Sequence, residues 1–173
     1  FADSMLPKLG IHVEYFNSCD LNELKSKINQ KTSVVFVESP GSITFEISDI
    51  AVISEISHRM NAKVLVDNSW ATPLFFQPLK HGADVSIQAV TKYIGGHSDI
   101  LMGTATANAA SIEQLNKVVH FFGETTSPDD IYLASRGLRS LAVRLKQHEE
   151  NGVILAHYLN EHPAIDVVNH PAL

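Results

Sequence analysis

A lysine, a hydroxyl group and two glycines follow a short, mainly apolar run in the middle of the chain. Lys92 comes after residues 86–90 and next to Thr91, and Gly95 and Gly96 follow it. A lysine at the end of a buried strand is partly desolvated, which favours the neutral amine that can attack a carbonyl carbon. Most lysines are solvated, so a surface lysine that closes a strand is the alternative explanation of this segment taken alone.

A second apolar run ends in a carboxylate upstream of Lys92. Residues 62–66 are apolar apart from one lysine and lead directly into Asp67. Both runs have the character of buried parallel strands, and residues 71–84 are long enough for the crossover between them. Because ligands of open α/β sheets bind at the carboxyl ends of the strands, we expect Asp67 and Lys92 to face one crevice. Taken alone, Asp67 has a second explanation as a helix cap or turn acid.

An amine and a carboxylate at neighbouring strand ends are the groups that a pyridine-based cofactor requires. Lys92 would bind the aldehyde carbon, Asp67 would keep the ring nitrogen protonated, and Thr91 would offer a hydroxyl to the phosphate. The sequence therefore predicts a site for pyridoxal 5'-phosphate (PLP). Trp70, the one tryptophan, either lines this site or packs beside it, and both explanations stay open.

Five segments, spread along the chain, resemble one known family. They are Glu38–Thr44, Val66–Trp70, Ser86–Asp99, Ser135–Ser140 and Val168–Leu173. In this order they are similar to the cystathionine γ-synthase / β-lyase family of PLP-dependent enzymes, and above all to its bacterial β-lyase branch. Only the N-terminal part of the chain matches weakly, and such a long collinear match is far more specific than any single motif.

The resemblance implies an α/β fold of the aspartate-aminotransferase-like class (fold type I). This is the large domain of a PLP-dependent transferase, with a mostly parallel sheet and flanking helices. Residues 1–137 would form this PLP-binding domain without its N-terminal part. Residues 138–173 would form a linking helix and the start of the small C-terminal domain. We therefore expect the chain to be an internal part of a longer protein.

The resemblance also implies a reaction and a role for each site residue. Lys92 would carry PLP and take the α-proton, Asp67 would stabilise the charged ring, and Thr91 would bind the phosphate. The expected substrate is L-cystathionine, cleaved by β-elimination to homocysteine, ammonia and pyruvate in the trans-sulfuration steps of methionine biosynthesis. The expected assembly is a cytoplasmic homotetramer. The chain alone is expected to be inactive, because the family's phosphate loop, a Tyr/Arg pair from a neighbouring subunit and its substrate-binding arginine lie outside it.

Two positions depart from the family pattern. Many relatives carry an asparagine that contacts the cofactor where this chain has Ser42, and a second hydroxyl where it has Ala89. Neither contact is therefore expected here. A γ-synthase, a γ-lyase, a sulfhydrylase or a non-catalytic scaffold are the alternatives. The joint presence of Asp67, Thr91 and Lys92 argues against a scaffold, because a disused site need not keep all three.

Composition excludes several other classes of protein. The 173 residues are 45% hydrophobic and carry a net charge of −6 with no basic run, which argues against nucleic acid and anionic membranes as partners. No apolar run is long enough for a membrane span. The single cysteine, Cys19, excludes an internal disulfide and is typical of a reducing compartment. No glycine-rich nucleotide-binding fingerprint follows any expected strand.

Two further groups of polar residues are possible sites. His97 and Asp99 could ligate a metal, but no second pair with ligand spacing accompanies them, so no metal is expected and hydrogen bonds that fix the loop behind Lys92 are preferred. Arg136, Arg139 and Arg144 cluster with Lys146 near the expected domain joint. Salt bridges across that joint are favoured over phosphate or carboxylate binding.

The elements that must position these residues follow from periodicity and end signals. Strands are expected at 11–16, 33–38, 62–67, 84–90, 101–108 and 164–168, with 101–108 returning antiparallel to 84–90. Helices are expected at 21–29, 50–61, 111–122, 128–136 and 138–160. Their expected caps are Asp20, Ser48 and Ser111, with Pro128 opening a helix and Gly137 acting as a hinge.

Overall fold

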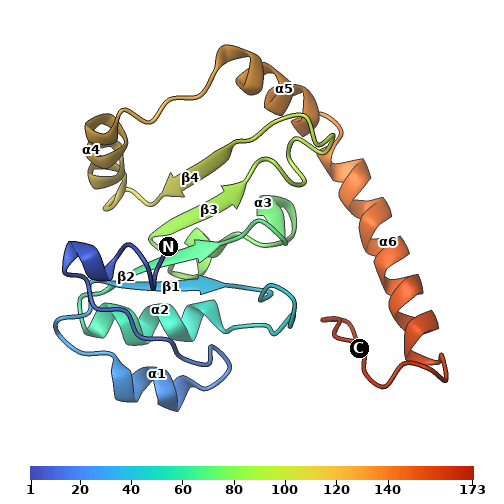
Figure 1. Ribbon diagram of the computed structural model, residues 1–173, viewed down its shortest axis with the longest axis horizontal. Coiled ribbons are helices and arrows are strands. Elements are labelled where there is room, and N and C mark those ends of the chain that lie inside the picture. The colour runs from blue at the N-terminus through green and yellow to red at the C-terminus, as the bar shows by residue number, and fades with distance from the viewer.

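Four strands form one sheet in the computed structural model, which describes all of residues 1–173 (Figure 1). They are β1 (Val34–Glu38), β2 (Lys63–Asp67), β3 (Val85–Ala89) and β4 (Gly103–Ala107), hydrogen-bonded in the order β1-β2-β3-β4. The first three are parallel, and β4 runs antiparallel to β3, as expected from the sequence. The carboxyl ends of β1, β2 and β3 therefore meet at one edge, where Glu38 is in register with Asp67 and Asp67 with Ile87.

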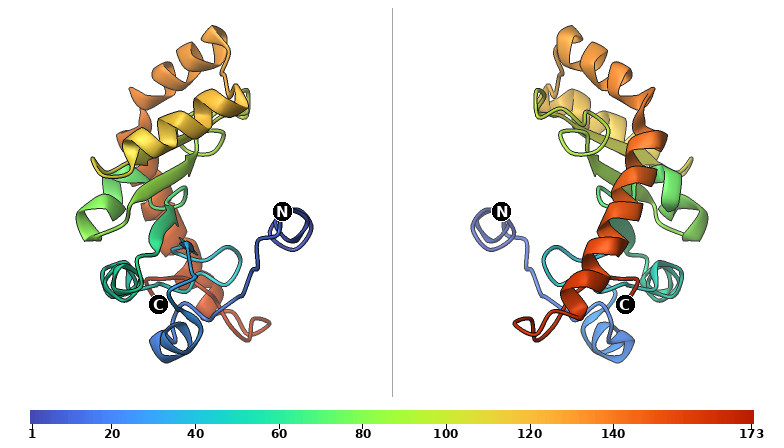
Figure 2. Two further views of the ribbon diagram at one scale, coloured as in Figure 1. Left: turned by 90° about the vertical axis from the view of Figure 1, so that its left-hand side faces the viewer. Right: turned by 90° about the vertical axis from the view of Figure 1, so that its right-hand side faces the viewer.

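Eight helical segments connect and flank the strands. They are η1 (Pro7–Leu9), α1 (Leu21–Lys27), α2 (Ile50–Arg59), α3 (Thr72–Phe75), η2 (Pro78–His81), α4 (Ile112–Phe122), α5 (Pro128–Leu138) and α6 (Leu141–Asn160). The long helix α6 crosses the molecule on the side toward which β1, β2 and β3 point, and it lies in front of the strands in the right-hand view of Figure 2. No helix has both the length and the apolar character needed to cross a membrane.

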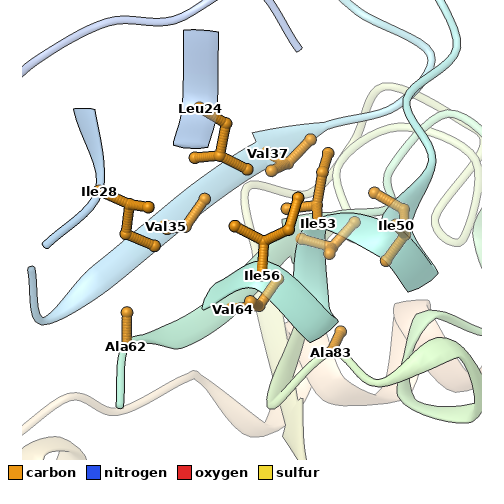
Figure 3. Packing of buried hydrophobic residues seen from close by; sticks show 11 residues of the cluster. Leu24, Ile28, Val35, Val37, Ile50, Ile53, Ile56, Ala62, Val64 and Ala83 are labelled. Carbon is orange, nitrogen blue, oxygen red and sulfur yellow. The ribbon is translucent and has the colours of Figure 1, made fainter. Parts of the chain in front are cut away.

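The first of two cores lies between β1, β2 and the helices α1 and α2 (Figure 3). Isoleucines at helical spacing on α2 (Ile50, Ile53 and Ile56) face Val64 and Val66 of β2, which are fully buried. Burial of each such side chain stabilises the fold by roughly 1.5–3 kcal/mol, so this core accounts for the rigid placement of the β1 and β2 ends.

The second core lies beyond the end of β3, around the turn that follows this strand. Six buried side chains form it: Val90, Ile94, Ile100, Ala134, Leu141 and Leu145. They join the segment around Lys92 to α5 and α6, which are far away in the sequence. The position of Lys92 therefore depends on helices that follow it in the chain, whereas the position of Asp67 depends on the first core.

The helix ends show why these segments begin where they do. The side chain of Asp20 accepts hydrogen bonds from the amides of Asn22 and Glu23, which confirms it as the cap of α1. The cap of α2 is Asp49, which accepts from the amide of Val52 at 3.0 Å, so the prediction of Ser48 was wrong by one residue. Ser111 precedes α4 but makes no capping bond, because its hydroxyl binds Asp84 instead.

Several expected elements are absent or placed differently. No strand forms at 11–16 or at 164–168. Gly137 is not a hinge: it lies buried inside α5, and the break between α5 and α6 falls at Arg139 and Ser140. In β1, Val34 and Phe36 are exposed while Val35 and Val37 are buried, so this strand alternates rather than being buried on both faces.

Candidate active site

A cleft of about 620 Å³ opens at the edge where β1, β2 and β3 end. Glu38 ends β1, Ser69 and Trp70 follow β2, Thr91 and Lys92 follow β3, and His148 of α6 also lines the cleft. A second hollow of about 400 Å³ is lined by Asp67, Met102 and, again, Thr91. Asp67 and Lys92, which were expected to face one crevice, therefore line two different hollows that share Thr91.

Lys92 is exposed, and its amine makes no hydrogen bond or ion pair with another protein group. The backbone around it is fixed: the Lys92 amide donates to the carbonyl of Ala89 at 3.0 Å, and the Gly96 amide donates to the carbonyl of Lys92 at 2.9 Å. The expectation that Lys92 is desolvated is therefore wrong for this chain, because the apolar neighbours that follow it turn into the second core and leave its side chain facing the cleft.

Asp67 is half-buried, and one of its two carboxylate oxygens is bound within the protein. Oδ1 accepts from the amide of Ser69 at 2.9 Å, and the hydroxyl oxygen of Ser69 accepts from the amide of Ala89 at 2.6 Å. This short chain of contacts ties the end of β2 to the end of β3. Oδ2 has no protein partner, so Asp67 closes a turn and still has a carboxylate oxygen available to a ligand.

The hydroxyl of Thr91 is bound to the backbone at the start of β4. It donates to the carbonyl of Met102 at 3.2 Å and accepts from the amide of Met102 at 3.0 Å. Thr91 therefore joins the Lys92 turn to β4. A phosphate oxygen that accepted a hydrogen bond from this hydroxyl would replace the Met102 carbonyl as acceptor, while the bond from the Met102 amide would remain.

Glu38, the last residue of β1, lines the cleft and holds the turn that follows it. The Ser42 hydroxyl donates to Glu38 at 2.6 Å, and its amide donates to the other oxygen of the same carboxylate at 3.3 Å. Trp70 lines the cleft and also meets Phe45 edge to face, with ring centroids 6.4 Å apart. Both explanations of Trp70 that the sequence left open thus apply.

The polar groups that the sequence offers as alternative sites have protein partners. His97 Nδ1 lies 2.9 Å from the carbonyl oxygen of Gly95, which confirms the hydrogen bond expected to fix this loop. Asp99 pairs with Arg136 at 3.6 Å, a salt bridge between the Lys92 loop and α5. Among the basic residues, Arg139 is an exception, since its side chain has no protein partner. Arg144 binds backbone carbonyls rather than an acid, which the clustering of basic residues did not reveal.

A buried acid at the opposite end of the sheet also escaped the sequence analysis. Asp84, immediately before β3, is 2% exposed. Five groups donate to its carboxylate: His58 Nε2, Lys63 Nζ, the Val64 amide, Asn108 Nδ2 and Ser111 Oγ. Burial raises the pKa of Asp84, but the hydrogen bonds from Lys63, the Val64 amide, His58 and Asn108 outweigh burial and hold the pKa far below its ordinary value of 3.8.

The side chains that line the cleft and the second hollow together match the needs of the pyridine cofactor expected from the sequence. They supply an amine without a protein partner on Lys92, a free carboxylate oxygen on Asp67 and a hydroxyl on Thr91. The cleft volume falls within the range of about 300–1,000 Å³ that is typical of small-molecule sites. PLP therefore fits both the donor groups and the space.

Comparison with known proteins identifies relatives that are enzymes of amino-acid metabolism. A model of the family described as Cys/Met metabolism PLP-dependent enzyme matches residues 1–173. Cystathionine beta-lyase MetC of Escherichia coli is 42% identical over 100% of this chain and 44% of its own length. An L-alanine/L-glutamate racemase of Wolbachia pipientis is 41% identical over 100% of this chain and 42% of its own length.

The fold has equally clear counterparts among solved structures. The crystal structure of cystathionine gamma-lyase from Lactobacillus plantarum complexed with L-serine superposes with a TM-score of 0.96 at 27% sequence identity. The superposition covers 99% of this chain and 45% of that one. The expected α/β fold of PLP-dependent enzymes is thereby confirmed. The chain spans less than half the length of each of these three proteins.

Proposed function

The chain belongs to the Cys/Met metabolism PLP-dependent enzyme family, and we propose that the whole protein is a carbon–sulfur lyase that acts on L-cystathionine by β-elimination. The observation that carries the proposal is the unpaired amine of Lys92 beside Thr91 and the strand-end carboxylate of Asp67. The products would be homocysteine, ammonia and pyruvate. The similarity to the cystathionine beta-lyase of E. coli over the entire chain supports this choice of substrate.

Each site residue has a proposed task that its position supports. When bound, PLP supplies an electron sink that stabilises the negative charge left after loss of the α-proton. Lys92 binds the cofactor, and its freed amine then takes the α-proton of the substrate. The free oxygen of Asp67 accepts a hydrogen bond from the protonated ring nitrogen, and Thr91 binds the phosphate. Loss of the α-proton and of the sulfur group leaves an enamine, which water converts to pyruvate and ammonia.

The surroundings of this site are part of the proposal. We infer that residues 1–137 belong to the cofactor domain and that residues 138–173 begin the connection to a smaller C-terminal domain. The position of α6 beside the cleft supports this division. The whole protein would work as a homotetramer in the cytoplasm, in methionine biosynthesis.

The test uses the whole protein loaded with PLP. Borohydride reduction followed by peptide mapping should place the pyridoxyl label on Lys92, and Lys92→Ala should remove both the label and pyruvate release from cystathionine. Lys31→Ala is the matched control, because Lys31 is also exposed and its amine also has no protein partner. A label on another lysine, or pyruvate release at an undiminished rate by Lys92→Ala, would overturn the assignment.

A second reaction has specific support from one relative. The racemase of Wolbachia pipientis matches the whole chain at 41% identity, and racemisation shares the removal of the α-proton. The two reactions diverge after this shared step: racemisation returns a proton to the α-carbon, whereas elimination expels the group on the β-carbon. Assays for pyruvate and 2-oxobutyrate from cystathionine, and for D-alanine from L-alanine, separate β-elimination, γ-elimination and racemisation. Pyruvate should dominate, and D-alanine or 2-oxobutyrate as the main product would reject the lyase proposal.

A further inference from the structure

The turn that follows Lys92 is held by one arginine of α6. Arg144 donates from Nη1 to the carbonyl of Tyr93 at 2.7 Å and from Nη2 to the carbonyl of Ile94 at 3.4 Å. These are the two residues immediately after Lys92. Because both acceptors are main-chain atoms, the contacts fix the path of the backbone and do not depend on which side chains the turn carries.

The same guanidinium is anchored to the joint between α5 and α6. Nη2 of Arg144 donates to the carbonyl of Gly137 at 3.0 Å, and Nε donates to the hydroxyl of Ser140 at 3.0 Å. Gly137 contributes one of the last carbonyls of α5, where the helix dipole attracts a cation. The planar fork of arginine can bind this joint and the Lys92 turn at once, whereas a lysine ammonium has no such geometry.

Two glycines allow the close approach on which these bonds depend. A Cβ built on Gly96 would lie 2.3 Å from Nη1 of Arg144, and a Cβ built on Gly137 would lie 2.1 Å from the carbonyl oxygen of Ile94. Gly96 also has a φ of 77°, in the left-handed region. The turn and α5 therefore touch backbone to backbone, with the guanidinium inserted beside them.

We propose that Arg144 is a positioning residue for Lys92, and that its bonds to the Tyr93 and Ile94 carbonyls set where the lysine amine stands in the cleft. The inference rests on the proposed function of Lys92 and adds to it a residue that touches neither cofactor nor substrate. Apolar contacts of the second core hold the turn against α6 without a preferred direction, whereas the hydrogen bonds of Arg144 are directional.

The first experiment is hydrogen–deuterium exchange on the whole protein without cofactor. The amides of Gly95 and Gly96 report on the turn, since they donate to the carbonyls of Val90 and Lys92. In Arg144→Met they should exchange at least about tenfold faster, because charge-assisted bonds that close the turn are lost. The amides of β2 should not change. Arg139→Met is the control, because Arg139 is exposed at the same joint and its side chain has no partner.

The second experiment follows the attachment of PLP to Lys92 by borohydride trapping and mass spectrometry. Arg144→Met should slow the labelling of Lys92 by about tenfold and lower kcat to a similar extent, with KM changed less than about twofold. Arg139→Met should match the unsubstituted protein in both. If Lys92 of the unsubstituted protein takes no label, the proposed function fails, while the exchange experiment still decides whether Arg144 holds the turn.

Two glycine substitutions, one a test and one its control, probe the same contact while Arg144 stays in place. Gly96→Ala displaces Arg144 and adds backbone strain, whereas Gly123→Ala adds similar strain at a φ of 66° with no atom within 4 Å of the new methyl group. Only Gly96→Ala should speed exchange at Gly95 and slow labelling, and it should add little to Arg144→Met in the double variant. Unchanged exchange and labelling in Arg144→Met, or equal acceleration at β2 and at the turn, would overturn the proposal.

Discussion

A charged side chain joins several segments at each end of β3: Asp84 at the start of the strand and Arg144 beyond its end. These two side chains use different kinds of partner. Asp84, at the start of the strand, is a buried anion bound by side chains and one amide of α2, β2 and the segment between β4 and α4. Arg144, beyond the end of the strand, is a half-buried cation bound mainly to backbone carbonyls. The first arrangement joins elements that already pack on one another, whereas the second fixes a turn that carries a reactive side chain.

The difference follows from burial and from the type of partner. Removal of a buried carboxylate leaves the buried Val64 amide and Ser111 hydroxyl without a partner, so the whole sheet loses stability. When the half-buried guanidinium of Arg144 is removed, water can bind the carbonyls that it leaves, so the free energy of unfolding falls only slightly. The main consequence is that the turn carrying Lys92 is no longer held in place. The comparison predicts that substitutions at the Asp84 end change stability, and that polar substitutions at the Arg144 end change geometry and activity.

The largest expected effect is that of Asp84→Ala. It should lower the free energy of unfolding of this domain by about 3 kcal/mol, at the lower end of the range for breaking buried ion pairs, because Lys63 and His58 are about 40% exposed and can be solvated again. Urea denaturation followed by circular dichroism measures the change. Asp166→Ala, at an exposed acid without partners, should change stability by less than about 0.5 kcal/mol. Equal effects of the two variants would refute a stabilising role for the Asp84 cluster.

A buried glycine of α5, next to the second core, should give the next largest effect. Gly137→Ala places a methyl group 2.1 Å from the carbonyl oxygen of Ile94, which is backbone and cannot move aside easily, so a loss of roughly 2 to 3 kcal/mol is expected. Gly152→Ala in α6 is the matched control: its nearest neighbour lies at 3.8 Å, so the gain in helix propensity should stabilise by up to about 1 kcal/mol. Thermal unfolding of both variants checks the sign, and a neutral Gly137→Ala would mean that α5 does not press against the Lys92 turn.

The sequence could predict the parts of this molecule that depend on local pattern. Asp67 and Lys92 follow apolar runs that the structure confirms as parallel strands, and Asp20, the predicted cap of α1, lies within three residues of the amides that it binds. Apolar runs and helix caps can be recognised in the sequence because the interactions behind them act within one strand or one turn of helix. The antiparallel return of β4 was likewise foreseen from a short connection.

Features that depend on distant partners could not be predicted in the same way. Arg144 and Tyr93 are separated by 51 positions and Asp84 and His58 by 26, so neither cluster has a spacing signature. Residues 11–16 have a plausible strand composition but no neighbouring strand to bond with, and composition alone does not create a sheet. The exposure of Lys92 depends on which neighbours turn into the second core, and this too is a tertiary property.

Acid should affect the Asp84 end more than the Arg144 end. In the unfolded chain the Asp84 carboxyl takes up a proton near pH 3.8, whereas in the folded chain its lowered pKa keeps it ionised to a more acidic pH. Between these values the unfolded state binds more protons, so the stabilisation by Asp84 is fully present above about pH 5 and is lost as the pH falls through this window.

Measurement of unfolding free energy from pH 5 down to pH 3 in the original protein and in Asp84→Asn checks this sign. The original protein should lose about 1 kcal/mol more than the variant over this range. Glu23, bound to Lys27, and Glu46, bound to Thr44, also have lowered pKa values, but they are present in both proteins and their contributions cancel in the difference. Parallel curves for the two proteins would show that the ionised form of Asp84 does not stabilise the fold.

The smallest expected effect concerns Thr91, which lies between the two hollows of the site. Thr91→Val removes the two hydroxyl contacts to Met102 and the proposed contact to phosphate, but keeps the backbone bond from the Thr91 amide to the Met102 carbonyl, whereas Thr91→Ser keeps the hydroxyl. If the hydroxyl binds phosphate, Thr91→Val should weaken PLP binding about tenfold, or roughly 1.4 kcal/mol, and leave the binding of pyridoxal, which has no phosphate, nearly unchanged. If the hydroxyl serves only to hold the Met102 backbone, both compounds should bind more weakly by the same factor. Titration of the apo protein with each compound therefore separates a ligand contact from a positioning contact at the one residue that borders both Asp67 and Lys92.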